Sequence, residues 1–291
     1  MRRSRRRQDG IPGYRSARLS LRCVYTDLDG TLYGKHGSLF RDAEGNFTMM
    51  QARALEACHR AGVEVVIMSG RREAQVMADA RVIGQSSYIY EAGCGVTIDF
   101  ERTLLVGDWA SKDDEAPTPA QRMLDAGIPD LLFERFGDRL EWHRPWHTDR
   151  HLSHLFRGKV DVAEANAAIA EAGHEDVRFL DNGAISRPME SVEGSAHAYH
   201  LVPGGASKAN AVAFHVQARG YDPESCIAVG DSLEDLDVAR AVGRFFAVAN
   251  GPERDEVMRE ALPGFPNVTV TEGAMGDGFY EAVVSTLAER P

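Results

Sequence analysis

The strongest constraint on the fold is a regular alternation of short apolar runs with helical segments. Runs such as 63-VEVVIMSG-70 and 225-SCIAVGD-231 are almost continuously apolar, which is typical of strands buried on both faces. Segments rich in helix formers separate these runs. Strands that alternate with helices pair in parallel, and the helices then cover both faces of the sheet. The sequence therefore predicts an α/β, Rossmann-like parallel sheet.

The expected elements fall into two groups with a different segment between them. Strands are expected at 21–27, 63–70, 87–93, 225–231, 244–251 and 267–270. Helices are expected at 48–62 (capped by a Thr), 71–84, 207–220, 233–243, 252–262 (starting at a Pro) and 279–290. Between these groups, an Ala-rich helix at 161–173 precedes short polar strands at 177–183, 184–188 and 197–202. We therefore expect an α/β core from residues 21–109 and 201–291, with an inserted α+β unit at 110–200.

Composition excludes several classes of protein. The chain is 43% hydrophobic and 26% charged, so it can form a sizeable core. Its net charge of −11 argues against general nucleic-acid binding, and no apolar run reaches the ~18 residues of a membrane span. The four cysteines are scattered without a CxxC pair, which favours reduced, buried thiols in a cytoplasmic protein.

The first residues are exceptional because they are strongly basic. Residues 1–22 contain eight Arg and one Asp, and they lack the apolar stretch of a secretory signal. We expect residues 1–20 to be a disordered tail or an extension from the choice of start site. A tether to an anionic surface is the alternative.

Four short motifs stand at the ends of expected strands or at the start of a helix. They are 27-DLDGT-31, 69-SGR-71, 205-GASK-208 and 230-GDS-232 with a further acid at 235. Each motif is weak alone, since Asp, Ser and Gly are also common turn residues. Open parallel sheets bind their ligands at the carboxyl ends of the strands, so the four motifs together indicate one site.

In these motifs and their order the sequence resembles the phosphohydrolases of the haloacid dehalogenase superfamily. The short first-to-second spacing and the long second-to-third spacing resemble the branch with a large cap after the second motif. That branch includes Cof-like, sucrose-phosphatase-like and mannosyl-3-phosphoglycerate-phosphatase-like enzymes. The resemblance covers the chain from about residue 21 onward and implies that 110–200 is the cap domain.

The resemblance implies Mg²⁺ as cofactor and a role for each acid. Asp27 would attack phosphorus and become an aspartyl-phosphate, and Asp29 would act as general acid and base. The Asp27 side chain, the Asp29 carbonyl and the Asp231 side chain would hold the metal, supported by Asp235. An acid-rich oxygen site is also what Mg²⁺ prefers on chemical grounds. As turn residues or solvated helix acids, the same side chains would have no such role.

Five further residues are implied as phosphate ligands. Ser69 and Gly70 would donate hydrogen bonds to the phosphoryl oxygens, and Lys208 would neutralise their charge in the transition state. Thr31 would bind the same oxygens or orient the nucleophile, and Asn250 resembles a residue near the phosphate. Ser69 could instead cap the following helix, Lys208 could be a surface lysine, and Asn250 could be a turn residue.

The last motif departs from its relatives at one position. Glu234 stands where relatives often have Asn, which leaves the fine geometry of the metal site open.

The segment 141-EWHRPWHTDRHLSHLFRG-158 contains histidines at 143, 147, 151 and 154. Their spacing could align imidazoles on a helix, but Pro145 would break that helix, so we do not expect a second metal. We expect cap residues here to bind the anionic or hydroxyl-rich part of the substrate: Arg144, Arg150, His151 and His154. The alternative is that they are packing or surface residues.

The sequence thus predicts a Mg²⁺-dependent phosphatase for a small phosphate monoester, such as a sugar, polyol or glycerate phosphate. A cap of this size closes over a small molecule and excludes water, which disfavours phosphoproteins as substrates. The expected partner is that substrate, with no nucleic acid and no membrane. The alternatives are a phosphomannomutase-like phosphomutase and a non-catalytic binding protein with the same fold.

Overall fold

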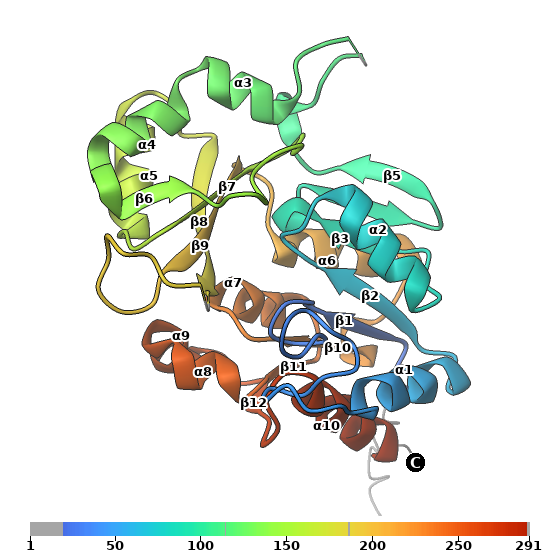
Figure 1. The fold of residues 1–291 in the computed structure, drawn as a ribbon. Coiled ribbons are helices and arrows are strands. Elements are labelled where there is room, and N and C mark those ends of the chain that lie inside the picture. Colours follow the sequence, from blue (N-terminus) through green and yellow to red (C-terminus); the bar gives the residue numbers. More distant parts are fainter. Residues whose placement is uncertain (1–19, 114, 186, 290–291) are drawn as a thin grey trace, which may run out of the picture.

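A large, mostly parallel sheet forms the core of the computed structural model, which describes residues 20–113, 115–185 and 187–289 (Figure 1). The basic tail expected at residues 1–20 therefore lies almost wholly outside the described residues. The sheet has the order β12-β11-β10-β1-β2-β3-β4-β5. Its strands are β1 Cys23–Thr26, β2 Glu64–Met68, β3 Tyr88–Tyr90, β4 Gly95–Ile98, β5 Glu101–Leu104, β10 Cys226–Gly230, β11 Arg244–Ala247 and β12 Val268–Val270. The α/β prediction is confirmed.

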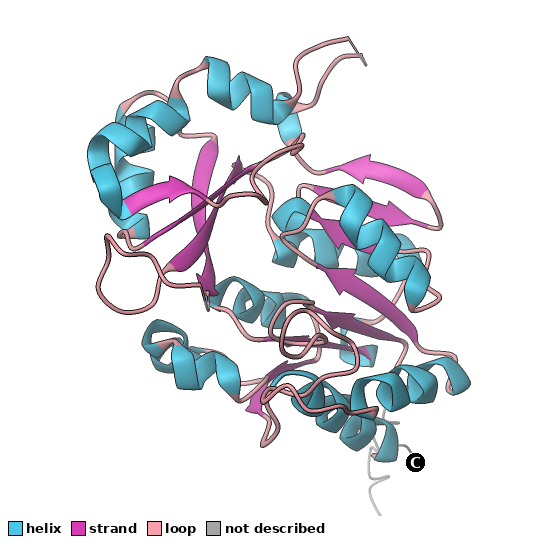
Figure 2. Cartoon of the chain, in the orientation of Figure 1, coloured by secondary structure: helices cyan, strands magenta, loops and turns pink. Residues whose placement is uncertain are grey.

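The central strand β1 is buried on both faces, which explains its continuously apolar sequence. It pairs in parallel with β10 on one side and β2 on the other. Successive side chains of a strand point to opposite faces, so Val24 packs in one apolar cluster and Tyr25 in the other. Helices cover both faces of the sheet (Figure 2).

One face of the sheet is covered by α1 Met50–Arg60, α2 Glu73–Val82 and α10 Met275–Ala288. The other is covered by α6 Lys208–Arg219, together with buried residues of α7 Leu233–Leu236 and α9 Glu256–Ala261. A short helix α8, Asn250–Arg254, precedes α9.

Three expectations for the helices are wrong in detail. The Thr48 hydroxyl accepts a hydrogen bond from the Met50 N–H, but the N-cap position of α1 is held by Met49, whose side chain makes no capping hydrogen bond. The expected helix at 252–262 begins earlier and is broken at Asp255, whose side chain caps α9. The expected helix at 233–243 continues beyond α7 only as a 3₁₀ turn.

The sheet also has an antiparallel edge that the sequence did not predict. A tight turn at 91–94 with positive φ angles at Glu91, Ala92 and Gly93 reverses the chain after β3. β4 and β5 then extend the sheet as a hairpin. These strands are short, so neither has the long apolar run by which the others were found.

A second, antiparallel sheet has the order β6-β7-β9-β8. Its strands are β6 Leu140–Trp142, β7 His154–Gly158, β8 Val177–Ala184 and β9 His197–Pro203. Helices α3 Pro119–Asp125, α4 Ile128–Phe136 and α5 Val162–Glu171 accompany it. Rings of Phe133, Phe156 and Phe179 pack between the sheet and the helices. The strand expected at 184–188 is represented only by Ala184, the last residue of β8.

β9 runs three residues past the expected boundary at 200 and returns the chain to the core. We keep 110–200 as the proposed cap and 21–109 with 201–291 as the proposed core. All four cysteines are buried and none of them forms a disulfide in the described part of the chain. Among the described residues, no helix is long and apolar enough to cross a membrane.

Candidate active site

Four chain segments meet at the carboxyl end of the central strands. Asp27 follows β1, Ser69 follows β2, Asp231 follows β10, and Lys208 begins α6. Carboxylate oxygens of Asp27, Asp231 and Asp235 lie within 4.8 Å of one another. The parallel sheet thus places together residues that are about two hundred positions apart in sequence.

Lys208 is the centre of this cluster. Its Nζ donates to Asp27 Oδ1 at 2.9 Å and to Asp235 Oδ1 at 2.7 Å, and its side chain is 1% exposed. Burial alone would lower the pKa of Lys208, but the carboxylates of Asp235 and Asp27 outweigh it and raise this pKa well above its usual value. Lys208 is therefore a buried ammonium paired with two carboxylates and not a surface lysine.

When ionised, Asp27, Asp231 and Asp235 carry more negative charge than the single positive charge of Lys208 can neutralise. Burial raises the pKa of Asp27 to about 7, against the opposing effect of Lys208, and the neighbouring Asp235 raises it further. Burial, followed by the charges of Asp27 and Asp235, raises the pKa of Asp231 well above its usual value. Close, buried carboxylates of this kind are stabilised in the ionised form by a cation. Hard oxygen donors with net negative charge fit Mg²⁺.

Thr31 and Asn250 contact the carboxylate of Asp231. The Thr31 hydroxyl donates to Asp231 Oδ1 at 2.9 Å, and Asn250 Nδ2 donates to Asp231 Oδ2 at 3.2 Å. Asn250 also donates to the Gly30 carbonyl, which joins the two loops. Gly30 has φ +91°, and a Cβ there would lie 2.3 Å from Asp231 Oδ2, so a side chain is excluded. These residues hold the metal-ligand candidate in this structure, whereas the sequence suggested them for the phosphate.

Asp235 orients the loop that carries Asp231. Its Oδ2 accepts hydrogen bonds from the Ser232 N–H at 3.1 Å and from the Ser232 hydroxyl at 2.7 Å. Glu234, the residue that departs from the relatives, is buried beside Lys208. Burial raises the pKa of Glu234 to about 8, although Lys208 opposes the shift.

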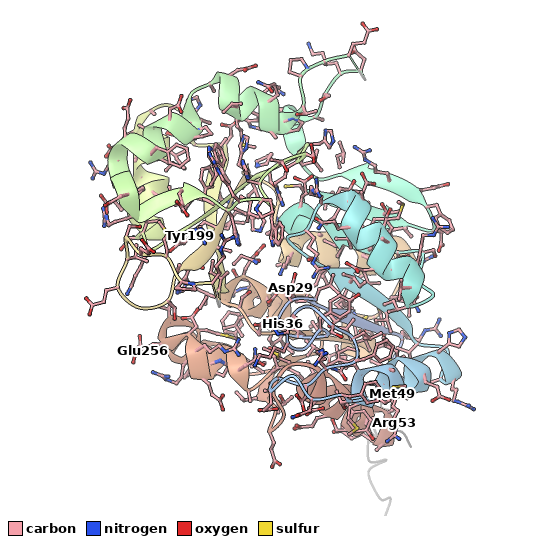
Figure 3. The ribbon with its side chains drawn as sticks, in the orientation of Figure 1. Asp29, His36, Met49, Arg53, Tyr199 and Glu256 are labelled. Atoms are coloured by element: carbon pink, nitrogen blue, oxygen red, sulfur yellow. The ribbon has the colours of Figure 1, made fainter. Side chains whose placement is uncertain are left out.

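Asp29 has a partner that the sequence did not identify. Arg71 donates to both carboxylate oxygens of Asp29, at 2.6 and 2.7 Å, and its Nη1 donates to Asp79 at 2.8 Å. Asp79 in turn accepts the Tyr33 hydroxyl. The Asp29 side chain is 58% exposed, on the side of the core that faces the second sheet (Figure 3). The only sequence signal for Arg71 was its place directly after Ser69-Gly70.

The loop at Ser69 and Gly70 is joined to the proposed cap. Ser69 is buried, and its hydroxyl accepts from the Arg71 N–H at 3.2 Å. Arg150 Nη2 donates to the Gly70 carbonyl at 2.7 Å. A Cβ at Gly70 would lie 2.4 Å from His200 Nε2, so the close approach of the second sheet requires glycine.

Glu91 is a second link that sequence reasoning missed. This buried core carboxylate accepts hydrogen bonds from the N–H groups of three successive residues, 151–153, and from the Ser153 hydroxyl. It also lies 3.8 Å from Arg150, whose side chain is 2% exposed. A lone Glu after a short strand gives no sequence signal of this role.

The four cap residues expected to contact substrate lie in different places. Arg150 reaches the Gly70 loop, and His151 is exposed. His154 is buried within the second sheet, where its Nε2 is 2.8 Å from the Ala120 carbonyl and its ring packs on Trp142. Arg144 is exposed beside a pocket of the second sheet. Among the described residues, the histidines of 143–154 do not belong to any group of side chains close enough together to hold a metal ion.

Solved structures identify the class of fold. The chain superposes on the sucrose-phosphatase of Synechocystis sp. PCC6803 with a TM-score of 0.62, 13% identity, and coverage of 92% of this chain and 98% of that chain. It superposes on a haloacid dehalogenase-like hydrolase from Bacteroides thetaiotaomicron with a TM-score of 0.56, 16% identity, and coverage of 91% and 99%. The fold is therefore that of the haloacid dehalogenase-like proteins.

Sequence comparisons extend this to the family. The family model described as haloacid dehalogenase-like hydrolase matches residues 164–258. The phosphoglycolate phosphatase of Halobacterium salinarum is 34% identical over 257 residues, covering 88% of this chain and 93% of the relative. That of Methanoculleus marisnigri is 28% identical over 270 residues, covering 90% and 95%. The chain belongs to the haloacid dehalogenase-like hydrolases, as its motifs predicted.

Proposed function

We propose that this protein is a Mg²⁺-dependent phosphatase that hydrolyses a small-molecule phosphate monoester. The observation that carries the proposal is the buried Lys208, which bridges Asp27 and Asp235 next to Asp231. A cation at this position can neutralise a phosphoryl group and hold the nucleophile ready for attack. Membership of a hydrolase family supports the same reaction type.

The substrate we propose is a phosphorylated sugar, polyol or small hydroxy acid such as glycerate or glycolate. Relatives that cover most of the chain are named phosphoglycolate phosphatases, and a structural neighbour is a sucrose-phosphatase bound to sucrose and phosphate. A second sheet that contacts the Gly70 loop also suits a small ligand, because it restricts the space above the proposed phosphate site.

The metal would be held by the Asp27 and Asp231 side chains and the Asp29 carbonyl, with Asp235 in support. When bound, Mg²⁺ would supply positive charge that draws the phosphate dianion to an otherwise acidic site. Thr31 would keep the Asp231 carboxylate in place through the hydrogen bond already present.

Asp27 is the proposed nucleophile. A carboxylate oxygen of Asp27 forms a bond to phosphorus while the ester bond to the leaving oxygen breaks, and this gives an aspartyl-phosphate. Lys208, together with Ser69 and the N–H groups of its loop, would neutralise the oxygens of the transferring group. Water then attacks phosphorus, releases inorganic phosphate and regenerates the Asp27 carboxylate.

Asp29 is the proposed general acid and base. It gives a proton to the leaving oxygen in the first step and takes one from the attacking water in the second. In this structure both oxygens of Asp29 accept hydrogen bonds from Arg71. We therefore infer that Asp29 leaves this bidentate pair before it transfers a proton.

We propose the cytoplasm as the site of this reaction. The four buried cysteines, which form no disulfide among the described residues, suit a reducing compartment. The proposed partner is the phosphorylated substrate alone.

The test measures phosphate release from sugar, polyol, glycerate, glycolate and nucleotide monophosphates, with Mg²⁺ or with EDTA. The variants are Asp27→Asn and, as a matched control, Asp138→Asn, which changes an exposed acid of the proposed cap. We expect release that requires Mg²⁺, is abolished in Asp27→Asn and is retained in Asp138→Asn. Absence of release from every substrate would overturn the proposal. Fast isomerisation of a sugar phosphate would then indicate a mutase, and lack of Mg²⁺ binding a non-catalytic protein.

A further inference from the structure

A pocket on the second sheet has an unusual concentration of positive charge. It has a volume of about 360 Å³ and lies beside the edge strand β6. Three arginines line it together with two aromatic rings and one acid: Arg144, Arg157, Arg187, Trp142, Phe133 and Glu141. The chain as a whole has a net charge of −11, so a pocket with three guanidinium groups and one carboxylate stands out.

Two of the three guanidinium groups have no carboxylate partner among the residues that the structure describes. Arg157 pairs with Glu141, with Nε 2.6 Å from Oε1. Arg187 Nη1 donates to the carbonyl of Arg144 at 3.1 Å, which ties the two arginines to one wall. Within the described part of the chain, neither Arg144 nor Arg187 has a carboxylate at ion-pair distance. The pocket therefore has net positive charge and free hydrogen-bond donors, which an anion would satisfy.

Two buried nitrogen atoms next to the pocket, which lack a hydrogen-bond partner among the described residues, also indicate a site for an anion. Arg157 Nη1 and His143 Nδ1 are both buried without a hydrogen-bond partner among the described residues. Such atoms are rare in folded proteins, because an unsatisfied buried polar group is costly. Burial, and after it the charges of Arg157 and Arg187, lowers the pKa of His143 to about 4. The positive charges of the pocket are thus felt inside the second sheet.

The second sheet also places basic side chains beside the proposed active site. His200 lies on β9, two strands from β6, and its ring contacts the Gly70 loop. The charges of Arg150 and Lys208 both act on His200, and Arg150 Nη2 lies 3.5 Å from its Nδ1.

We propose that the pocket lined by Arg144, Arg157 and Arg187 is an anion-binding site for the phosphate or carboxylate group of a small molecule. The anion has two possible sources, which share this chemistry. It is either the far end of the substrate, when that substrate has a second anionic group, or a separate small anion. The binding itself does not rest on the proposed phosphatase function.

The first experiment uses sulfate as the probe and the fluorescence of Trp142 as the readout, in EDTA so that the metal-dependent site is silent. The full chain is titrated as wild type, as Arg144→Gln with Arg187→Gln, and as Arg139→Gln. Arg139 is exposed in the same unit and does not line the pocket, so it is the matched control. We expect saturable binding that the double variant weakens at least ten-fold and Arg139→Gln by less than two-fold. Equal sulfate affinity in all three proteins overturns the proposal.

Two controls keep the readout specific. Trp146 is 59% exposed and does not line the pocket, so Trp146→Phe should keep the sulfate-dependent signal and Trp142→Phe should lose it. A signal that persists in Trp142→Phe places sulfate elsewhere and contradicts the assignment. Circular dichroism of each variant shows that the loss is not caused by unfolding.

The second experiment separates the two sources by kinetics with fructose 6-phosphate and fructose 1,6-bisphosphate. If the pocket takes the far end of the substrate, the double variant raises KM several-fold for the bisphosphate alone. If it takes a separate anion, KM changes for neither sugar, and sulfate alters turnover in the wild type but not in the variant. If the wild type binds sulfate but hydrolyses neither sugar phosphate, the proposed phosphatase is contradicted and the anion site is not.

Discussion

Replacing Glu91 with glutamine tests how the core holds the segment 151–153. Glu91 Oε1 accepts the His151 N–H at 3.2 Å, and Oε2 accepts two N–H groups and a hydroxyl at 2.7 to 3.1 Å. Glutamine has one acceptor oxygen and one amino group. Its amino group must therefore face the backbone donor of His151, which costs a hydrogen bond and adds a donor–donor contact. The change also leaves the buried guanidinium of Arg150 without its carboxylate at 3.8 Å.

Breaking a buried ion pair by removing one partner typically costs 3–5 kcal/mol. In Glu91→Gln the remaining side-chain oxygen can still accept the three hydrogen bonds of Oε2. We therefore expect the free energy of unfolding to fall by about 3 kcal/mol, the lower end of this range. For a chain of this size that corresponds to a decrease of about 5 °C in Tm. Activity should decrease as well, since Arg150 also donates to the carbonyl of Gly70.

The assay is urea unfolding followed by circular dichroism and by tryptophan fluorescence. Glu134→Gln is the matched control, because Glu134 is an exposed residue of α4. We expect the control to unfold at the wild-type midpoint and Glu91→Gln well below it. Coincident midpoints for the two variants would refute the reasoning that Glu91 holds this segment.

Two further predictions concern other ion pairs. Arg71→Lys keeps the charge beside Asp29 but loses the bidentate geometry, so Asp29 leaves its partner more readily and we expect kcat to rise about three-fold with little change in KM. Arg60→Lys, in an exposed pair, is the control, and an unchanged kcat for Arg71→Lys would contradict the role of the pair. The hydrogen bond that His197 Nδ1 donates to the carboxylate of Asp181 raises the pKa of His197. That pair stabilises the fold fully below about pH 6.5 and loses this effect as the pH rises through the raised value. Urea unfolding should therefore show Asp181→Asn to be more destabilising at about pH 5.5 than at about pH 9, and an equal effect would count against the pair.

The core and its motifs could be predicted because each depends on local sequence. Val65, Val66 and Ile67 lie in a continuous apolar run, and such a run is compatible with a strand buried on both faces. The polar residue that follows each run must lie at the same edge of a parallel sheet. Asp27 and Asp231 could therefore be placed together before their distance was known.

The hairpin of β4 and β5 and the detail of the second sheet were harder to predict. These strands are short, and β5 is mostly exposed, so their stability comes from pairing with neighbours and not from their own pattern. The turn before β4 has positive φ angles at Glu91 and Ala92, and the turn between β4 and β5 has them at Asp99 and Phe100, which is uncommon for residues other than glycine.

What the sequence by itself determined is the α/β core and the set of acids and the lysine at its edge. The hydrophobic pattern predicts the core, and the order of the motifs predicts which residues lie at its edge. Only the tertiary structure decided that Arg71 holds Asp29, that Thr31 and Asn250 contact Asp231, and that arginines of the second sheet share a pocket. The physical reason is that a hydrogen bond or an ion pair requires a few ångströms of proximity and a direction. Residues distant in sequence acquire both only when the sheets and helices have packed.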